Sequence, residues 1–114
     1  MCFAIPFTFE ESLERIGQNP VSVTPRLYRA MENRKASDYV TKCMRQFKQG
    51  IFGITPLEDV KSNMEELEDG EGRVVARYDD GGILEDDIYI IANFSFNEPG
   101  VDYNYTTILY CNEY

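Results

Sequence analysis

The spacing of the hydrophobic positions divides this chain into a first part typical of helices and a last part typical of strands. Thr8 and Glu11 have the spacing of a capping box, in which each side chain accepts a hydrogen bond from an unpaired backbone amide, and Gly17 follows as a stop. They predict a short helix over residues 9–16. Thr24-Pro25 predicts a second short helix, because a proline at the first helical position removes only an amide that has no helical partner.

Two longer helices follow in the pattern. Ser37 can cap the first and Gly50 ends it, and its apolar side chains recur every three or four residues. This stripe comprises Tyr39, Val40, Cys43, Met44 and Phe47. The segment Thr55-Pro56-Leu57-Glu58 combines a capping box with a proline at a helix start. It predicts the fourth helix of the chain, which ends before Gly70. The apolar side of this helix comprises Leu57, Val60, Met64 and Leu67.

From Arg73 onward the hydrophobic period changes from about 3.6 residues to two, which is the period of a β-strand. Three strands are predicted, over residues 73–78, 88–96 and 103–111. Residues 79–87 contain glycines and acids that favour a hairpin turn. Strands joined by two short connections form an antiparallel meander, whose apolar face must be covered. The predicted architecture is therefore α+β, with about four N-terminal helices packed on a three-stranded antiparallel β-meander.

The length of 114 residues fits a single domain over residues 1–114. A hydrophobic content of 43%, which includes seven Phe and eight Tyr residues, supplies the apolar surface that a folded core needs. The N-terminus has no basic flank, and Pro6 and Glu10 interrupt its apolar run, so neither a signal peptide nor a membrane span is predicted. We therefore expect a cytoplasmic protein.

Several kinds of catalytic chemistry lack the residues they need. The chain contains no His, which excludes a histidine base, a Ser-His or Cys-His pair and ordinary His-containing zinc sites. It also has no Walker loop, Rossmann fingerprint or calcium-loop spacing, and a weak Mg²⁺ site at residues 85–87 is less favoured than a hydrated turn. The widely spaced Cys2, Cys43 and Cys111 indicate reduced thiols. We predict a protein that is not an enzyme and needs no metal or cofactor.

Charge is segregated along the chain. Residues 1–53 form a mildly basic helical part, with five acidic and eight basic residues. Residues 54–114 form an acidic helix plus the sheet, with 15 acidic and three basic residues, and the whole chain has a net charge of −9. A field of one sign attracts a partner of the opposite sign and repels nucleic acid. The charge predicts a protein partner with a basic groove and no direct binding of nucleic acid, although the bases within residues 26–48 could still form a local patch.

The acidic residues of the second part are the first candidate site. They comprise Glu65, Glu66, Glu68, Asp69 and Glu71 from the last helix, and Asp79, Asp80, Glu85, Asp86 and Asp87 from the hairpin. Carboxylates spaced along a surface can imitate the phosphates of a nucleic acid. This interpretation requires the helix end and the hairpin to lie close together as one anionic face. The alternative is a surface that only keeps the protein soluble.

The tyrosines of the last predicted strand are the second candidate site. Tyr103 and Tyr105 begin this strand, and Tyr110 and Tyr114 follow at its end. Tyrosine is rigid and amphipathic and is favoured at protein interfaces, and an edge strand can pair with another chain. A homodimer is therefore possible. The alternative is an ordinary half-buried face of a sheet.

From about Gln49 onward the chain resembles a family of small uncharacterised proteins carried by bacterial plasmids, phages and integrative elements. The motifs that carry the resemblance are Gly50–Gly53, Glu58-Asp59 with Asn63, Arg73–Tyr78, Ile88–Ile91 and Thr106–Tyr114. Phe52 and Tyr89 stand where the family has tryptophans, and the segment after Ile91 is longer. The resemblance implies a mobile element in a bacterial cytosol and brings no established activity.

These observations lead to two functional hypotheses. The first is a non-catalytic inhibitor of a host nucleic-acid-handling defence complex, of the anti-CRISPR or anti-restriction type, that imitates the charge of nucleic acid. The second is a dimeric regulatory or housekeeping protein of a mobile element that acts through protein–protein contacts. An enzyme that uses only carboxylates is a third class, and it would need two acids flanking a cleft.

Overall fold

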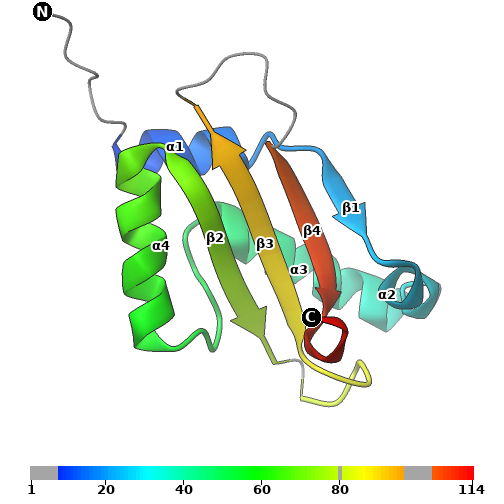
Figure 1. Cartoon of the computed structure of the whole chain (residues 1–114). Coiled ribbons are helices and arrows are strands. Elements are labelled where there is room, and N and C mark those ends of the chain that lie inside the picture. The colour runs from blue at the N-terminus through cyan, green and yellow to red at the C-terminus, as the bar shows by residue number, and fades with distance from the viewer. Residues whose placement is uncertain (1–7, 80, 97–103) are drawn as a thin grey trace, which may run out of the picture.

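The chain folds into a four-stranded sheet whose helices pack mainly against one of its faces (Figure 1). The computed structural model describes residues 8–79, 81–96 and 104–114. Its elements are α1 (Phe9–Ile16), β1 (Val21–Val23), α2 (Pro25–Ala30), α3 (Arg34–Lys48), α4 (Leu57–Asp69), β2 (Glu71–Tyr78), β3 (Ile88–Ser95), β4 (Tyr105–Tyr110) and a 3₁₀ turn, η1 (Cys111–Glu113). The α+β class is confirmed.

The helix starts follow the predicted caps with three exceptions. Thr24 stands at the predicted N-cap of α2, but its hydroxyl forms no capping hydrogen bond. Thr8 accepts a hydrogen bond from the backbone N–H of Glu11 at 3.1 Å, as the capping box predicts. Helix α3 begins earlier than predicted, because the Asn33 side chain, and not Ser37, accepts hydrogen bonds from its first amides. Helix α4 starts after Pro56 without a side-chain cap, because the Thr55 hydroxyl binds elsewhere in the fold.

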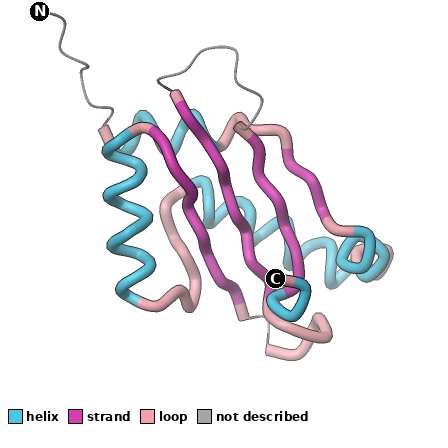
Figure 2. Tube along the Cα trace, in the orientation of Figure 1, coloured by secondary structure: helices cyan, strands magenta, loops and turns pink. Residues whose placement is uncertain are grey.

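The sheet differs from the predicted meander by one strand. Its order is β1-β4-β3-β2, in which β2, β3 and β4 are antiparallel as predicted, and β1 is added parallel to β4. The prediction of three strands is therefore wrong in this detail. Strand β1 has only three residues, between Pro20 and Thr24, and so short a segment carries no period that identifies a strand. Figure 2 shows β1 and β2 at the two edges of the sheet.

The main core lies between the sheet and the helices behind it in Figure 1. Helices contribute Ile16, Leu27, Val40, Phe47 and Leu67, all almost fully buried. The strands contribute side chains that lie side by side in register, such as Val74, Ala92 and Thr106, or Ala76, Ile90 and Ile108. Cys43 is buried in this core, and neither Cys43 nor Cys111 forms a disulfide, which agrees with the predicted reduced thiols.

Some of the predicted features lie outside the described residues. They are Cys2, Asp80, the turn at residues 97–100 and the start of the last strand at Tyr103.

Candidate functional site

The predicted acidic residues fall into two groups at opposite ends of β2. Helix α4 leads through Gly70 into the start of β2, whereas the hairpin follows the end of β2 at Tyr78. A strand of 8 residues at about 3.3 Å per residue places the two groups roughly 23 Å apart. In Figure 1 the end of α4 lies at the top of the sheet and the hairpin at its bottom. The expectation of one continuous anionic face is therefore wrong for the described residues.

The acids at the end of α4 remain a compact exposed group. We define the helix-end cluster as Glu65, Glu68, Asp69 and Glu71, all of which are exposed. Glu65, Glu68 and Glu71 have no ion-pair partner among the described residues, and the last turn of α4 contains no basic residue. Carboxylates at this end also add to the negative end of the helix dipole. The helix-end cluster therefore concentrates negative charge at one corner of the molecule.

Glu66 has a different role from the other acids of this helix. It is half-buried, and its Oε2 accepts a hydrogen bond from the backbone N–H of Arg73. The absent side chain of Gly72 allows this contact, because a Cβ there would clash with the Glu66 carboxylate. Glu66 was predicted to bind a partner, but its carboxylate forms a hydrogen bond that links α4 to β2.

The described acids of the hairpin have partners within the chain. Asp79 accepts from the backbone N–H of Gly81 at 2.9 Å, and Asp86 accepts from the backbone N–H of Asn112 at 2.9 Å. Glu85 forms an ion pair with Arg26 at 2.9 Å, and Asp87 forms one with Arg77 at 2.7 Å. These contacts assign a structural role to side chains that the sequence suggested as a binding surface.

The two ion pairs also shift the ionisation of their members. The hydrogen bond to Arg26 lowers the pKa of Glu85, and the same hydrogen bond raises the pKa of Arg26. The hydrogen bond to Asp87 raises the pKa of Arg77. Arg26 also lies over the Tyr110 ring, 4.9 Å from its centroid. The hairpin is thus held to α2 and to the end of β4, with much of its charge neutralised locally.

The outer edge of β2 is covered by side chains and backbone from the segment before it. The Asn63 side-chain amide donates to the carbonyl of Val75 at 2.8 Å and accepts from its N–H at 3.0 Å. The Thr55 hydroxyl accepts from the N–H of Arg77 at 2.8 Å, and the N–H of Ile54 donates to the Arg77 carbonyl at 2.9 Å. We call this the closed edge. The sequence held a signal for it, because Asn63 interrupts the apolar stripe of α4.

Among the described residues, no α-helix covers β3 and β4 on the face of the sheet opposite the main core (Figure 1). We call it the open face, and its side chains are Arg73, Val75, Arg77, Tyr89, Ile91, Asn93, Tyr105, Thr107 and Leu109. Arg77 lies over the Tyr89 ring at 5.9 Å, and Tyr89 meets Tyr114 edge to face at 5.5 Å. The sequence signalled this face weakly, since β3 has the apolar residues Tyr89 and Ile91 on this side as well as an apolar set on the core side.

The predicted tyrosine set is divided between this face and the core. Tyr105 is 42% exposed and lies on the open face. Tyr114 is 65% exposed and contacts Tyr89 of this face. Tyr110 is fully buried in the main core, so it cannot contact a partner, and Tyr103 lies outside the described residues.

The thiol of Cys111, which directly follows β4, is partly buried. Burial raises the pKa of this thiol to about 11, which keeps the group neutral at physiological pH.

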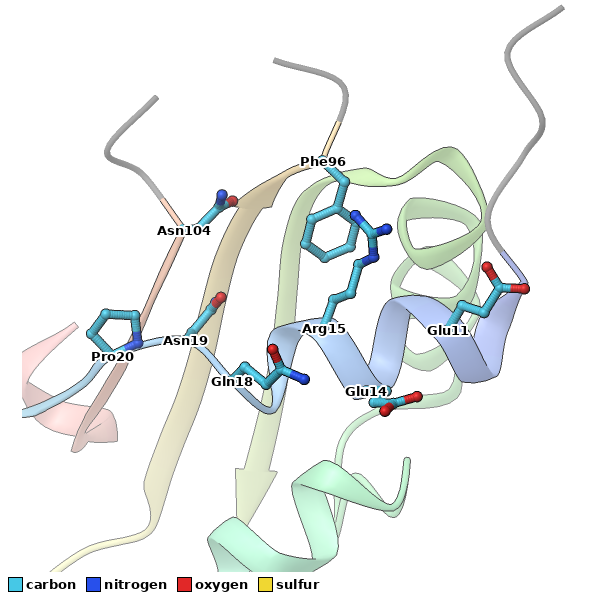
Figure 3. Close-up of a pocket in the computed structure, with 8 residues that line it drawn as sticks. All are labelled: Glu11, Glu14, Arg15, Gln18, Asn19, Pro20, Phe96 and Asn104. Carbon is cyan, nitrogen blue, oxygen red and sulfur yellow. The ribbon is translucent and has the colours of Figure 1, made fainter. Parts of the chain in front are cut away.

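A surface pocket with a volume of about 620 Å³ lies at the end of the sheet near α1 (Figure 3). Glu11, Glu14 and Arg15 line it from α1, and Arg15 lies over the Phe96 ring at 5.3 Å. Two of its amide side chains bind the backbone: Asn19 donates to the Asn93 carbonyl, and Asn104 accepts from the N–H of Ser95. The two acids of the pocket, Glu11 and Glu14, lie on the exposed side of the same helix.

Within the part of the chain that the structure describes, no group of three or more Cys, Asp or Glu side chains is placed to hold a metal ion. Nor is any described helix long and apolar enough to cross a membrane. Comparison with models of known protein families, with curated proteins and with solved structures finds no match.

Proposed function

We propose that this protein is a small non-catalytic inhibitor that binds a host nucleic-acid-handling defence complex, of the anti-CRISPR or anti-restriction type. The observation that carries the proposal is the helix-end cluster, a group of exposed acids of which Glu65, Glu68 and Glu71 have no ion-pair partner among the described residues. The cluster occupies the basic groove of the partner where a nucleic acid would otherwise bind. The bacterial mobile-element setting that the sequence resemblance implies agrees with this role.

The physical basis is competition for the same cationic surface. A chain with a net charge of −9 is drawn toward a basic groove at long range. Contact then releases the ions condensed around the groove, so the affinity falls as the salt concentration rises. The helix-end cluster spans residues 65–71, so it fills a small part of such a groove. The inhibitor would therefore block one position in the groove and not coat its length.

The test measures the dissociation constant of the chain for a Cas effector or restriction complex at several salt concentrations. The variant Glu65→Gln/Glu68→Gln/Glu71→Gln removes three charges from the cluster with little change in side-chain volume. We expect a loss of affinity of at least about tenfold and a weaker dependence on salt. The matched control, Glu32→Gln/Asp38→Asn/Glu58→Gln, removes the same charge from exposed acids elsewhere. Equal affinities for both variants would reject the cluster as the contact.

A second candidate function is a regulatory protein of a mobile element that dimerises through the open face. The observation that favours it is the exposed tyrosines at this face: Tyr105 is 42% exposed, and Tyr114, which contacts Tyr89, is 65% exposed. Sedimentation at high micromolar concentration tests it. A dimer that becomes monomeric on Tyr105→Lys supports this function, and a wild-type monomer removes it.

A further inference from the structure

The second edge of the sheet, formed by β1, is open. Strand β1 bonds to β4 through alternate residues: the Pro20 carbonyl accepts from Thr106 at 2.9 Å, and the Thr24 N–H donates to Ile108 at 3.1 Å. In a parallel pair the intervening residues direct their backbone groups to the other side. The N–H and C=O groups of Val21 and Val23 therefore point away from β4, and no described residue forms a hydrogen bond with them.

A groove runs beside this open edge, between β1 and α3. Its volume is about 410 Å³, and its lining is mostly apolar. Val21 and Val23 form one wall, and Val40 and Met44 of α3 form the other. Met31 is half-buried at the groove, and Val21 is 45% exposed. A strand that paired with β1 would place every second side chain above this apolar lining, because successive side chains of a strand alternate between the two faces of the sheet.

The charge at the groove indicates which kind of strand fits. Arg45 and Lys48 line it and are both exposed, and the lining contains no acid. Lys48 also lies beside Gly17, since a Cβ at Gly17 would be 3.5 Å from the Lys48 side chain. Because Gly17 shortly precedes β1, the positive charge lies toward the Val21 end of the groove. The groove is thus apolar along its length and basic at one end.

We propose that the open edge of β1 accepts an extended peptide segment of a partner protein as a fifth strand. Its apolar side chains enter the groove, and an acidic side chain on the same face pairs with Arg45 and Lys48. The backbone of Val21 and Val23 supplies the hydrogen bonds, as in other cases of strand addition. A second copy of this chain fits less well, because it would bring its own Arg45 and Lys48 to the same seam. This inference goes beyond the proposed function and uses a different surface.

The probes are two fluorescent peptides in which valine alternates with threonine, with one terminal valine replaced by glutamate. The two peptides have the same composition in opposite order, so that parallel and antiparallel pairing each have a matching probe. We expect at least one of them to bind the full chain, with saturable fluorescence anisotropy. The corresponding peptide with lysine in place of glutamate should bind at least about tenfold more weakly. Absence of binding by both glutamate peptides overturns the proposal.

A charge exchange tests the basic end of the groove. The variant Arg45→Glu/Lys48→Glu should bind the glutamate peptide at least about tenfold more weakly and should bind the lysine peptide more tightly than the wild type does. The matched control, Arg34→Glu/Lys42→Glu, makes the same change in net charge on exposed residues of α3 that do not line the groove. If both variants lose affinity equally, the overall net charge of the protein and not the charge at the groove attracts the peptide. The assignment of the peptide to the groove is then wrong.

Hydrogen exchange tests the backbone pairing. On binding, the amides of Val21 and Val23 should become protected, and Val21→Pro, which removes an outward-pointing donor, should lose at least about tenfold in affinity. Methylation of the peptide backbone nitrogens that face β1 gives the same test on the unchanged protein. Full binding by the methylated peptides, or protection of these amides by self-association without peptide, overturns the proposal. Glu65→Gln/Glu68→Gln/Glu71→Gln should leave peptide binding unchanged, which separates this site from the helix-end cluster.

Discussion

The two edges of the sheet differ in whether their outward-facing backbone groups are hydrogen-bonded. At β2, Asn63 and Thr55 satisfy outward-facing backbone groups of Val75 and Arg77. At β1, the equivalent groups of Val21 and Val23 have no such cover among the described residues. Unpaired strand edges recruit other strands, so most proteins shield them. Among the described residues, β1 is therefore the edge whose backbone groups stay available for pairing.

The surroundings of the two edges differ in charge as well. The closed edge adjoins α4, which carries the helix-end cluster, whereas the open edge adjoins the basic residues of α3. The segregation of charge along the chain therefore becomes a segregation across the sheet. A partner that binds the helix-end cluster and a peptide that pairs with β1 would therefore bind at separate places. The partner would present positive charge to the cluster, and the peptide would present negative charge to the groove.

The largest expected effect is at the closed edge, on replacing Asn63. Asn63→Ala leaves the N–H and C=O of Val75 without their partner, and Asn63 itself is 2% exposed. We expect the free energy of unfolding to fall by about 2 to 3 kcal/mol, measured by urea denaturation. The neighbouring Ser62→Ala, at an exposed position of the same helix, should change it by less than about 0.5 kcal/mol. Equal effects would show that the edge contact adds nothing.

Gly53 tests how closely the backbone approaches the closed edge. It has φ +62°, and a Cβ would lie 2.4 Å from the carbonyl oxygen of Arg77. Gly53→Ala should therefore lower the free energy of unfolding by roughly 2 kcal/mol. Gly81 has a similar φ of +68° with nothing near its Cβ position, so Gly81→Ala isolates the backbone strain, at about 1 kcal/mol. Thermal or urea unfolding measures the difference, and a larger loss at Gly81 would contradict the assignment.

Thr55 should give a smaller effect at the same edge. Its hydroxyl accepts from the N–H of Arg77 and donates to the carbonyl of Phe52. Thr55→Val keeps the shape and removes both hydrogen bonds, so we expect a loss of about 1 kcal/mol in the free energy of unfolding. Thr55→Ser keeps the hydroxyl and should retain most of this stability. If serine destabilises as much as valine, packing of the methyl group and not the hydrogen bond closes this edge.

The smallest effect on stability is expected at the open edge. Val21→Glu adds a negative charge, which repels the acidic side chain of the peptide, to a strand end that is 45% exposed, so the free energy of unfolding should change by less than about 0.5 kcal/mol. The same charge should discourage a strand of another chain from pairing there. Peptide binding measured by anisotropy should therefore fall while urea unfolding stays the same. A large loss of stability would mean that this edge is already part of the folded core.

The sequence predicted the elements that carry their own periodic signal. The strands β2 and β3 each show a period of two, the Tyr- and Thr-rich β4 follows a predicted turn, and α1 and α2 begin where their residues indicate. Strand β1 was missed because three residues are too few for a period, and its partner β4 lies far along the chain. The start of α3 was misplaced because Asn33 and Ser37 are both good caps, and only the fold decides between them.

The amino-acid sequence by itself determined the α+β class, the amphipathic helices, the absence of histidine chemistry and the division of charge. The tertiary structure decided which charges stay exposed, because the partners are distant in sequence: Arg26 and Glu85 are 59 positions apart. It also separated the two acidic groups by the length of β2 and left one sheet edge open. A period is a property of neighbouring residues, whereas an ion pair or a sheet edge exists only after distant segments have packed together.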